Sequence, residues 1–387
     1  MTNFRENNMY QRTLDRILEN NQHIKKEQVK KVLIWYEEID FFIGDTCLMF
    51  DKFRICKLFF GEDVVIDVNA VNKKYKDLYQ VFFQHNPNVS NMFHAELDEV
   101  AFEEYDIMIC VTYDEDILLR TMANRCGNLV ESGAFNLAVF SFTRNMLIDR
   151  KAFHIIFPVY QEIYDFGQLL LERPPEFYIT AEEKEWANNW LREQQLTAEE
   201  QLFVILDSSS SREKLLRIDV YFDVLKKLLR KDNVKVLIFD EKKVGKEHFY
   251  REWLSERQMK KIIFSRGQSL REGICLLGSD YVKLIMGPCT GLVHCASGIY
   301  NNRVRNGMPR EQAPVLITYT GPWDAQLWWG NAPLVNCLLM KDTGAVKELT
   351  LLSQLSDTEK KDIQSRPPCT EYTAEMLLGF VNSRLAN

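Results

Sequence analysis

Short apolar runs of strand length alternate with helical patterns through the first part of the chain. Strands are predicted at Lys31–Tyr36, Val64–Val68, Ile107–Val111 and His154–Pro158. Nearly continuous apolarity is typical of strands that are buried on both faces of a parallel sheet. Helices are predicted from about residue 8 to residue 30, and again after the Gly44-Asp45 turn. This alternation predicts an N-terminal, Rossmann-like, doubly wound α/β domain over residues 1–172.

A break then separates this pattern from a second one like it. Arg173-Pro174-Pro175 cannot continue a helix, and the charged helical stretch Ala181–Gln195 could connect two domains, so residues 173–200 are predicted to be a linker. Further strands are predicted at Leu202–Leu206, Val234–Phe239, Lys261–Phe264, Tyr281–Met286 and Pro314–Tyr319. Helices are predicted at Val220–Arg230 and at Thr373–Leu385, the second with Thr373 as its N-cap residue. Residues 201–387 are therefore predicted to form a second Rossmann-like domain that ends in a helix.

Composition narrows the class of protein. The 387 residues are 46% hydrophobic, which is enough for two cores, and the net charge of −7 argues against a general nucleic-acid binder. The nine cysteines form no regular framework, which fits reduced thiols in a cytoplasmic protein. The charged N-terminal segment is not a signal peptide, and no apolar run approaches the roughly 20 residues that cross a bilayer. The expectation is a soluble, cytoplasmic, two-domain protein.

The most informative stretch for function is residues 287–298, which follows one of the predicted strands. A Thr290-Gly291 turn leads into the predicted helix Leu292–Ile299. The free N–H groups and positive dipole end of such a helix suit a phosphate or diphosphate. His294, in the first turn, could donate to a phosphate oxygen as a neutral imidazole, although a histidine that merely bonds a backbone carbonyl is the alternative. Cys289, His294 and Cys295 lack a fourth ligand, so no metal site is expected.

A second loop that suits anions follows the predicted strand that ends at Leu206. Residues 208–214 place a serine cluster, including Ser209 and Ser210, ahead of Lys214. Hydroxyl groups and an ammonium group can donate to an anionic ligand. For this loop alone, a solvated polar surface is the competing explanation. Its pairing with the Thr290-Gly291 turn favours an anion site.

In the first domain, Asp45 lies at a turn between a strand and a helix. The aspartate could simply cap the helix. If a cleft between the domains holds an acceptor hydroxyl, however, the same carboxylate is placed to act as a general base. Ligands of open parallel sheets bind at the carboxyl ends of the strands, so the ligands of both domains would meet in one central cleft.

Taken in order, these loops resemble the motifs of the heptosyltransferase-type glycosyltransferases (glycosyltransferase family nine), which have a GT-B fold. The matching segments are Ile43-Gly44-Asp45-Thr46, the Leu206 strand with Ser209, Ser210 and Lys214, Gln268-Ser269-Leu270, Thr290-Gly291-Leu292-Val293-His294, and the Gly321-Pro322 turn. The resemblance covers about residues 31–330. It implies two Rossmann-like domains that face a central cleft.

The resemblance also implies a function. The chain would be an inverting, metal-independent glycosyltransferase that moves a sugar, such as a heptose, from a nucleotide-diphosphate donor to a hydroxyl of a glycan or lipid-linked acceptor. It needs no cofactor, and it could contact a membrane peripherally at the inner face. Asp45 would be the catalytic base. The donor would bind Ser209, Ser210, Lys214, Gln268, Thr290, Gly291 and His294.

The chain departs from the family pattern at its signature. Cys289 stands where the family carries an aspartate, and the segment Tyr300–Pro314 is longer than is usual there. A thiol does not supply the charge of a carboxylate, so the substitution bears on donor preference and on activity. Two alternatives therefore stay open: a catalytically silent protein that binds sugar nucleotides or glycans, and a GT-B sugar-nucleotide epimerase.

Overall fold

A computed structural model gives the architecture of the chain and describes residues 2–37, 41–112, 114–141, 156–169, 174–240, 244–342, 344 and 346–386. The chain divides into two compact units. The first consists of residues 1–42 and 48–172, and the second consists of Ile43–Cys47 together with Arg173–Asn387. Within the described ranges, no helix combines the length and the apolarity that a bilayer crossing needs.

The first unit alternates strands and helices. Its strands are β1 (Lys31–Tyr36), β2 (Val65–Ala70), β3 (Asn91–Phe93), β4 (Ile107–Val111) and β5 (Ala138–Ser141). Its helices are α1 (Thr2–His23), α2 (Ile43–Phe60), α3 (Lys76–Phe83), α4 (Glu115–Glu131) and α5 (Gln161–Leu169), of which α2 has its first turn in the second unit.

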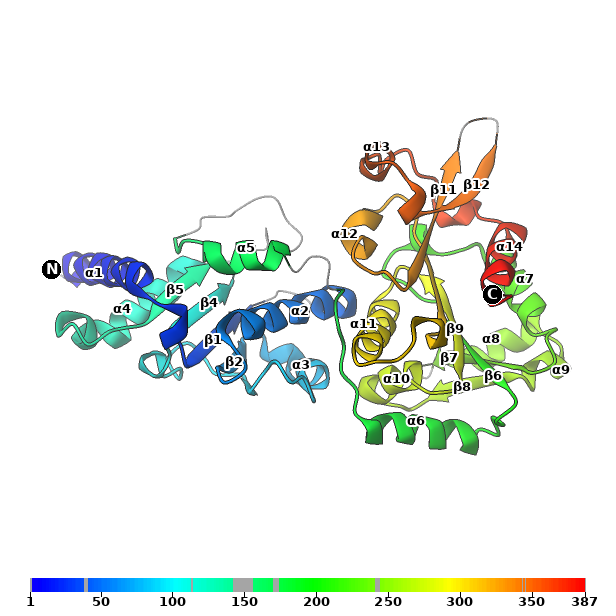
Figure 1. Ribbon diagram of the computed structural model, residues 1–387, viewed down its shortest axis with the longest axis horizontal. Helices are drawn as coiled ribbons and strands as arrows, with labels where there is room; N and C mark the ends of the chain where they lie inside the picture. The colour runs from blue at the N-terminus through cyan, green and yellow to red at the C-terminus, as the bar shows by residue number, and fades with distance from the viewer. Residues whose placement is uncertain are drawn as a thin grey trace. The chain divides into compact units, whose positions relative to one another are not determined.

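The five strands form one parallel sheet in the order β3-β2-β1-β4-β5. Leu33 and Trp35 of β1 point to one face and pack in a core with residues of α1 and α4. Tyr36 points to the other face, where its ring makes edge contacts with Phe53 of α2 and Tyr79 of α3. Helices thus cover both faces, as expected for strands that are apolar on both sides (Figure 1).

The second unit repeats the plan on a larger scale. Its strands are β6 (Gln201–Ile205), β7 (Val234–Asp240), β8 (Ile262–Arg266), β9 (Val282–Pro288), β10 (Val315–Tyr319), β11 (Val335–Asp342) and β12 (Lys347–Leu351). Its helices are α6 (Ala181–Glu193), α7 (Ile218–Leu228), α8 (Lys246–Trp253), α9 (Glu256–Met259), α10 (Leu270–Leu277), α11 (Gly291–Arg305), α12 (Ala325–Trp329), α13 (Asp357–Lys361) and α14 (Ala374–Leu385).

The seven strands run in the order β12-β11-β10-β9-β6-β7-β8, and only β12 is antiparallel to its neighbour. Residues of α7, α8 and α14 share one hydrophobic core with the sheet, while α10 packs against α6 and α11. Figure 1 shows α10 and α11 on one side of this sheet and α7 and α14 on the other. The predicted α/β class with two doubly wound sheets is confirmed.

Most predicted strands are found within one or two residues of their expected ends. The first strand, Lys31–Tyr36, and the strand Ile107–Val111 agree at both ends, and Thr373 caps the last helix by accepting a hydrogen bond from the N–H of Met376. The strand predicted at residues 154–158 is wrong where it can be checked: residues 154 and 155 lie outside the described residues, and residues 156–158 are not in a strand. The fifth strand of that sheet is instead β5, which a single bridge joins to Val159.

Candidate functional site

The candidate site lies at the carboxyl ends of β6 and β9 in the second unit. These neighbouring strands are the point at which the strand order reverses, because β7 and β8 extend the sheet on one side and β10 and β11 on the other. Such a switch point is where open α/β sheets bind ligands. Gly287 lets the two strands approach here, since a Cβ atom at this position would lie 2.5 Å from the Cβ atom of Leu206. The loops that follow Leu206 and Pro288 are the two that the sequence singled out.

Lys214 is the main positive charge of the site. It lies in a 3-10 turn (Arg212–Lys214) after β6, and only 8% of its surface is exposed. Its ammonium group sits 4.0 Å from the centre of the Trp323 ring. No carboxylate among the described residues forms an ion pair with it. A buried charge is costly unless an opposite charge accompanies it, so this lysine marks a place for an anion.

Several buried polar groups in the loops at this end of the sheet have no hydrogen-bond partner in the described part of the chain. The hydroxyl oxygen of Ser209 and the indole nitrogen of Trp323 are buried, and neither has a hydrogen-bond partner in the described part of the chain. The same is true of the hydroxyl of Thr320, at the end of β10. Buried polar groups are normally hydrogen-bonded, so unpaired ones at the carboxyl ends of strands are consistent with a ligand that supplies the missing hydrogen bonds.

His294 is held by two tryptophans that follow β10. Its ring stacks on Trp329, with 3.9 Å between the ring centres and 5° between the planes, while Trp328 meets it edge-on. The indole N–H of Trp329 in turn donates to the Cys289 thiol over 3.3 Å. The Cys289 thiol therefore accepts a hydrogen bond from the same tryptophan that stacks on the histidine.

Burial and the positive charge of Lys214 lower the pKa of His294 to about 3. The imidazole is therefore neutral at physiological pH and offers a hydrogen bond rather than a charge. Burial, partly offset by Lys214 and by the Trp329 hydrogen bond, raises the pKa of the Cys289 thiol, which stays protonated. In this group of side chains the positive charge thus resides on Lys214.

The low pKa of His294 has a measurable effect on stability. The unfolded chain binds a proton at His294 below a pKa of about 6.5, whereas the folded chain stays neutral down to about 3, so stability falls as the pH drops through this window. Between pH 7 and pH 5 we expect the parent protein to lose roughly 2 kcal/mol more than His294→Gln, as measured by denaturant unfolding. His248→Gln is the control, because the side chain of His248 is 90% exposed, and it should behave like the parent.

Asp45 belongs to the second unit through the segment Ile43–Cys47, the first turn of α2. The N-cap position of α2 is Phe42, so Asp45 lies inside the first turn rather than at the cap. Its negative charge contributes to the raised pKa of both Cys289 and Cys47, which places the carboxylate within electrostatic reach of the site.

The same segment packs against the start of α11. A Cβ atom at position 291 would lie 2.3 Å from the Cβ atom of Ile43, so only glycine fits there. One turn further on, the thiols of Cys47 and Cys295 lie 3.3 Å apart. Asp45, Gly291 and His294 are therefore brought together within one compact unit.

The remaining predicted residues differ in how closely they join this group. Thr290 is the N-cap residue of α11, but its side chain does not cap the helix. Ser210 is exposed in the serine loop. Gln268 follows β8 at the edge of the sheet, two strands away from β6, and its side-chain oxygen accepts a hydrogen bond from Ser265. The structure does not bring Gln268 to the switch point.

Two features of the site escaped the sequence analysis. No sequence pattern beyond its place after a Gly-Pro turn pointed to Trp329. Its stacking on His294 depends on how α12 packs in the folded unit. Asp207, just after β6, accepts hydrogen bonds from Lys246 and Tyr250, over 2.7 and 2.8 Å. Lys246 thus neutralises Asp207, the carboxylate closest in sequence to the serine cluster. Asp207 therefore does not balance the charge of Lys214. Within the described residues, no group of three or more His, Cys, Asp or Glu side chains is placed to hold a metal ion.

Two doubly wound units with these strand orders define a GT-B fold. The chain is similar to the E. coli ADP-heptose lps heptosyltransferase II, with a TM-score of 0.59 at 15% identity over 92% of this chain and 98% of that one. It is also similar to the family 9 glycosyl transferase of Veillonella parvula, with a TM-score of 0.61 at 14% identity over 94% and 99% of the two chains. No protein-family model and no curated protein sequence matches the chain. The expected fold is thereby confirmed.

Proposed function

We propose that this protein is an inverting glycosyltransferase that uses a nucleotide-diphosphate sugar as donor. The observation that carries the proposal is Lys214, a buried ammonium group at the switch point of the sheet with no anionic partner among the described residues. A diphosphate would supply the missing negative charge. Similarity in fold to two glycosyltransferases supports the same function.

The donor's diphosphate is assigned to the two loops at the carboxyl ends of β6 and β9. Lys214 contributes charge, while Ser209, Ser210 and Thr290 contribute hydroxyl donors. The start of α11 at Gly291 adds backbone N–H groups and the positive end of the helix dipole. Neutral His294 donates one further hydrogen bond. Charge that develops on the leaving diphosphate would then be met by fixed donors, without a requirement for a metal ion.

Transfer would proceed in a single displacement. The acceptor hydroxyl attacks the anomeric carbon of the donor, and Asp45 takes the hydroxyl proton as the new bond to oxygen forms. The bond between the anomeric carbon and the phosphate oxygen breaks, and its electron pair leaves with the nucleoside diphosphate. Because attack comes from the face opposite the leaving group, the configuration of the anomeric carbon is inverted.

The identity of the donor and acceptor is proposed at a coarser level. The name of the E. coli neighbour specifies ADP-heptose, which makes ADP-linked heptoses the first donors to test. The acceptor is proposed to be a hydroxyl of a glycan or of a lipid-linked molecule, bound mainly by the first unit. An acceptor of that kind fits a protein that acts in the cytoplasm, at the inner face of a membrane, in glycan or lipopolysaccharide synthesis.

The test is a screen of ADP-, GDP-, UDP- and dTDP-sugars for an increase in melting temperature, because a ligand that binds only the native state stabilises it. We expect at least one nucleotide sugar to stabilise the parent and to be consumed when an acceptor is added. Stabilisation without hydrolysis or transfer would identify a silent binding protein. Conversion of the free sugar nucleotide without an acceptor would identify an epimerase. Absence of any stabilisation would contradict the donor site.

A further inference from the structure

A cavity lies at the other end of the strands of the larger sheet, away from the loops of the candidate site. It has a volume of about 590 Å³, within the range of small-molecule sites, and it is lined at the amino ends of three parallel strands by Gln201 of β6, Val282 of β9 and Val315 of β10. The candidate donor site lies at the carboxyl ends of the same strands. Any ligand bound in this cavity is therefore separate from the donor.

Two cations on different elements line the cavity. Lys283 projects from β9 with an exposed side chain, and no described residue forms an ion pair or hydrogen bond with its ammonium group. Arg303 comes from α11, where its guanidinium group donates to the carbonyl of Gly278 over 2.5 Å and lies over the Tyr300 ring. Because a guanidinium group has five N–H donors, Arg303 is held in place and still has donors to offer.

Of the two acidic groups in the cavity, one is already paired outside the cation pair. Asp280 is already engaged, because Asn188 donates to it over 2.8 Å and Lys184 pairs with it over 3.2 Å; these contacts hold its pKa below the usual range. Glu311 carries a second carboxylate, on the loop after α11. In the described part of the chain it forms no ion pair. Arg384 of α14 adds a third cation at the rim.

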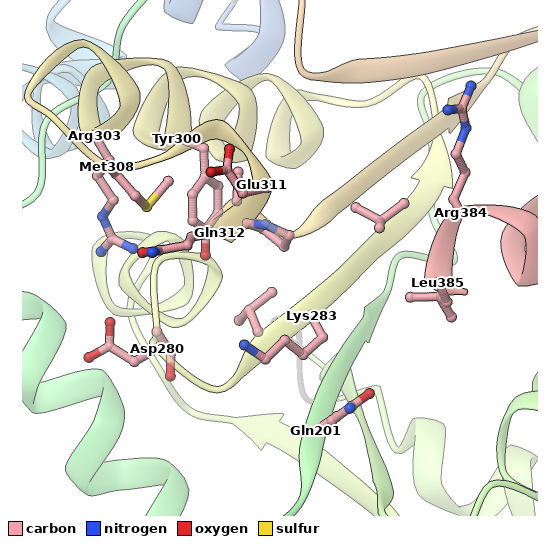
Figure 2. Close-up of a pocket in the computed structure, with 15 residues that line it drawn as sticks. Gln201, Asp280, Lys283, Tyr300, Arg303, Met308, Glu311, Gln312, Arg384 and Leu385 are labelled. Carbon is pink, nitrogen blue, oxygen red and sulfur yellow. The ribbon is translucent and has the colours of Figure 1, made fainter. Parts of the chain in front are cut away.

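Polar and apolar groups complete the lining. Figure 2 shows Tyr300, Arg303, Met308, Glu311 and Gln312 gathered on the side of α11 and the loop that follows it, with Lys283 and Gln201 on the strands. The amide and carboxylate groups can bond hydroxyls, and Met308 with the buried Val282 offers apolar surface. The cavity thus combines cations for an anionic group with acceptors for hydroxyls.

We propose that this cavity is a second ligand site, which binds a phosphorylated, polyhydroxylated small molecule such as a sugar phosphate. The phosphate lies between Lys283 and Arg303, because an ammonium and a preorganised guanidinium group both bind phosphate oxygens strongly. The hydroxyls face Glu311 and Gln312. The inference uses only the second unit and does not depend on the transferase proposal.

The test is calorimetric titration of the full-length protein with glucose 6-phosphate as the probe, alongside inorganic phosphate and glucose. We expect glucose 6-phosphate to bind more tightly than either fragment. Lys283→Ala should weaken its binding about tenfold, the usual effect of losing one charge-assisted contact, and Lys283→Arg should retain it. Lys283 is exposed, so both variants should fold.

Two further variants locate the binding. Lys227→Ala removes an equally exposed lysine from α7, outside the cavity, and should leave the affinity unchanged. Lys214→Ala alters the candidate donor site and so separates binding of the probe there from binding in this cavity. The proposal is overturned if the parent does not bind glucose 6-phosphate, if inorganic phosphate binds equally well, or if Lys214→Ala rather than Lys283→Ala abolishes binding.

Discussion

Replacement of Asp45 by asparagine is expected to lower the single-turnover rate of sugar transfer by about 10²–10⁴-fold, the usual contribution of a positioned general base. The amide keeps the shape of the side chain but cannot accept the hydroxyl proton. Donor affinity should change little, because the diphosphate is assigned to the loops after β6 and β9. The melting temperature should fall only modestly, since a carboxylate in the first turn of a helix contributes about 0.3–1 kcal/mol through the dipole.

Asp219→Asn is a matched control, because Asp219 also lies in the first turn of a helix, α7, and more than half of its side chain is exposed. It should show a similar small change in melting temperature and the parental rate. If Asp45→Asn also kept the parental rate, Asp45 would have only a structural role. The proton of the acceptor would then have to go to another group.

Replacement of Lys214 by methionine is expected to weaken nucleotide-sugar binding by about 10–100-fold while leaving the fold as stable as before or more so. The loss of affinity follows from removal of a charge-assisted contact, worth about 1.5–3 kcal/mol. The gain in stability follows because methionine fills a similar volume against Trp323 without a buried, unpaired charge. Titration calorimetry and denaturant unfolding of the same variant measure the two effects.

These opposite changes separate a binding role from a packing role. A lysine that merely packed against Trp323 would be replaced by methionine with no loss of affinity. The exposed Lys227, changed to methionine, controls for the loss of one positive charge from the protein as a whole and should alter neither quantity. A parental affinity in Lys214→Met would remove the central observation from the transferase proposal.

The sequence was sufficient to predict the fold because local and global signals agree along most of the chain. Apolar runs such as Lys31–Tyr36 are buried on both faces of a sheet. Turn residues follow these runs where the strands end. The apolar run His154–Pro158 was wrongly predicted to be a strand. Apolarity indicates burial rather than strand structure, and Phe157 is fully buried without lying in a strand. The short β5 is preceded by a loop and carries a weaker pattern.

The candidate site was predictable where it depends on loops that directly follow strands, as with Lys214 and His294. Parallel strands bring such loops to one edge whatever the details of packing. Gln268 follows a strand that lies two strands away from β6, and sequence order does not reveal this separation from the switch point. The contact of Trp329 with His294 and Cys289 depends on the path of the chain after β10, which no local pattern encodes.

The unpaired Lys214 also bears on the stability of this unit. A chain selected for stability alone would place an apolar residue against Trp323. With a buried ammonium group there, the empty protein carries an uncompensated charge, which the proposed donor would balance when it binds. The donor would then act as a structural component of its own binding site, and the lifetime of the folded protein in the cell would depend on the supply of that donor.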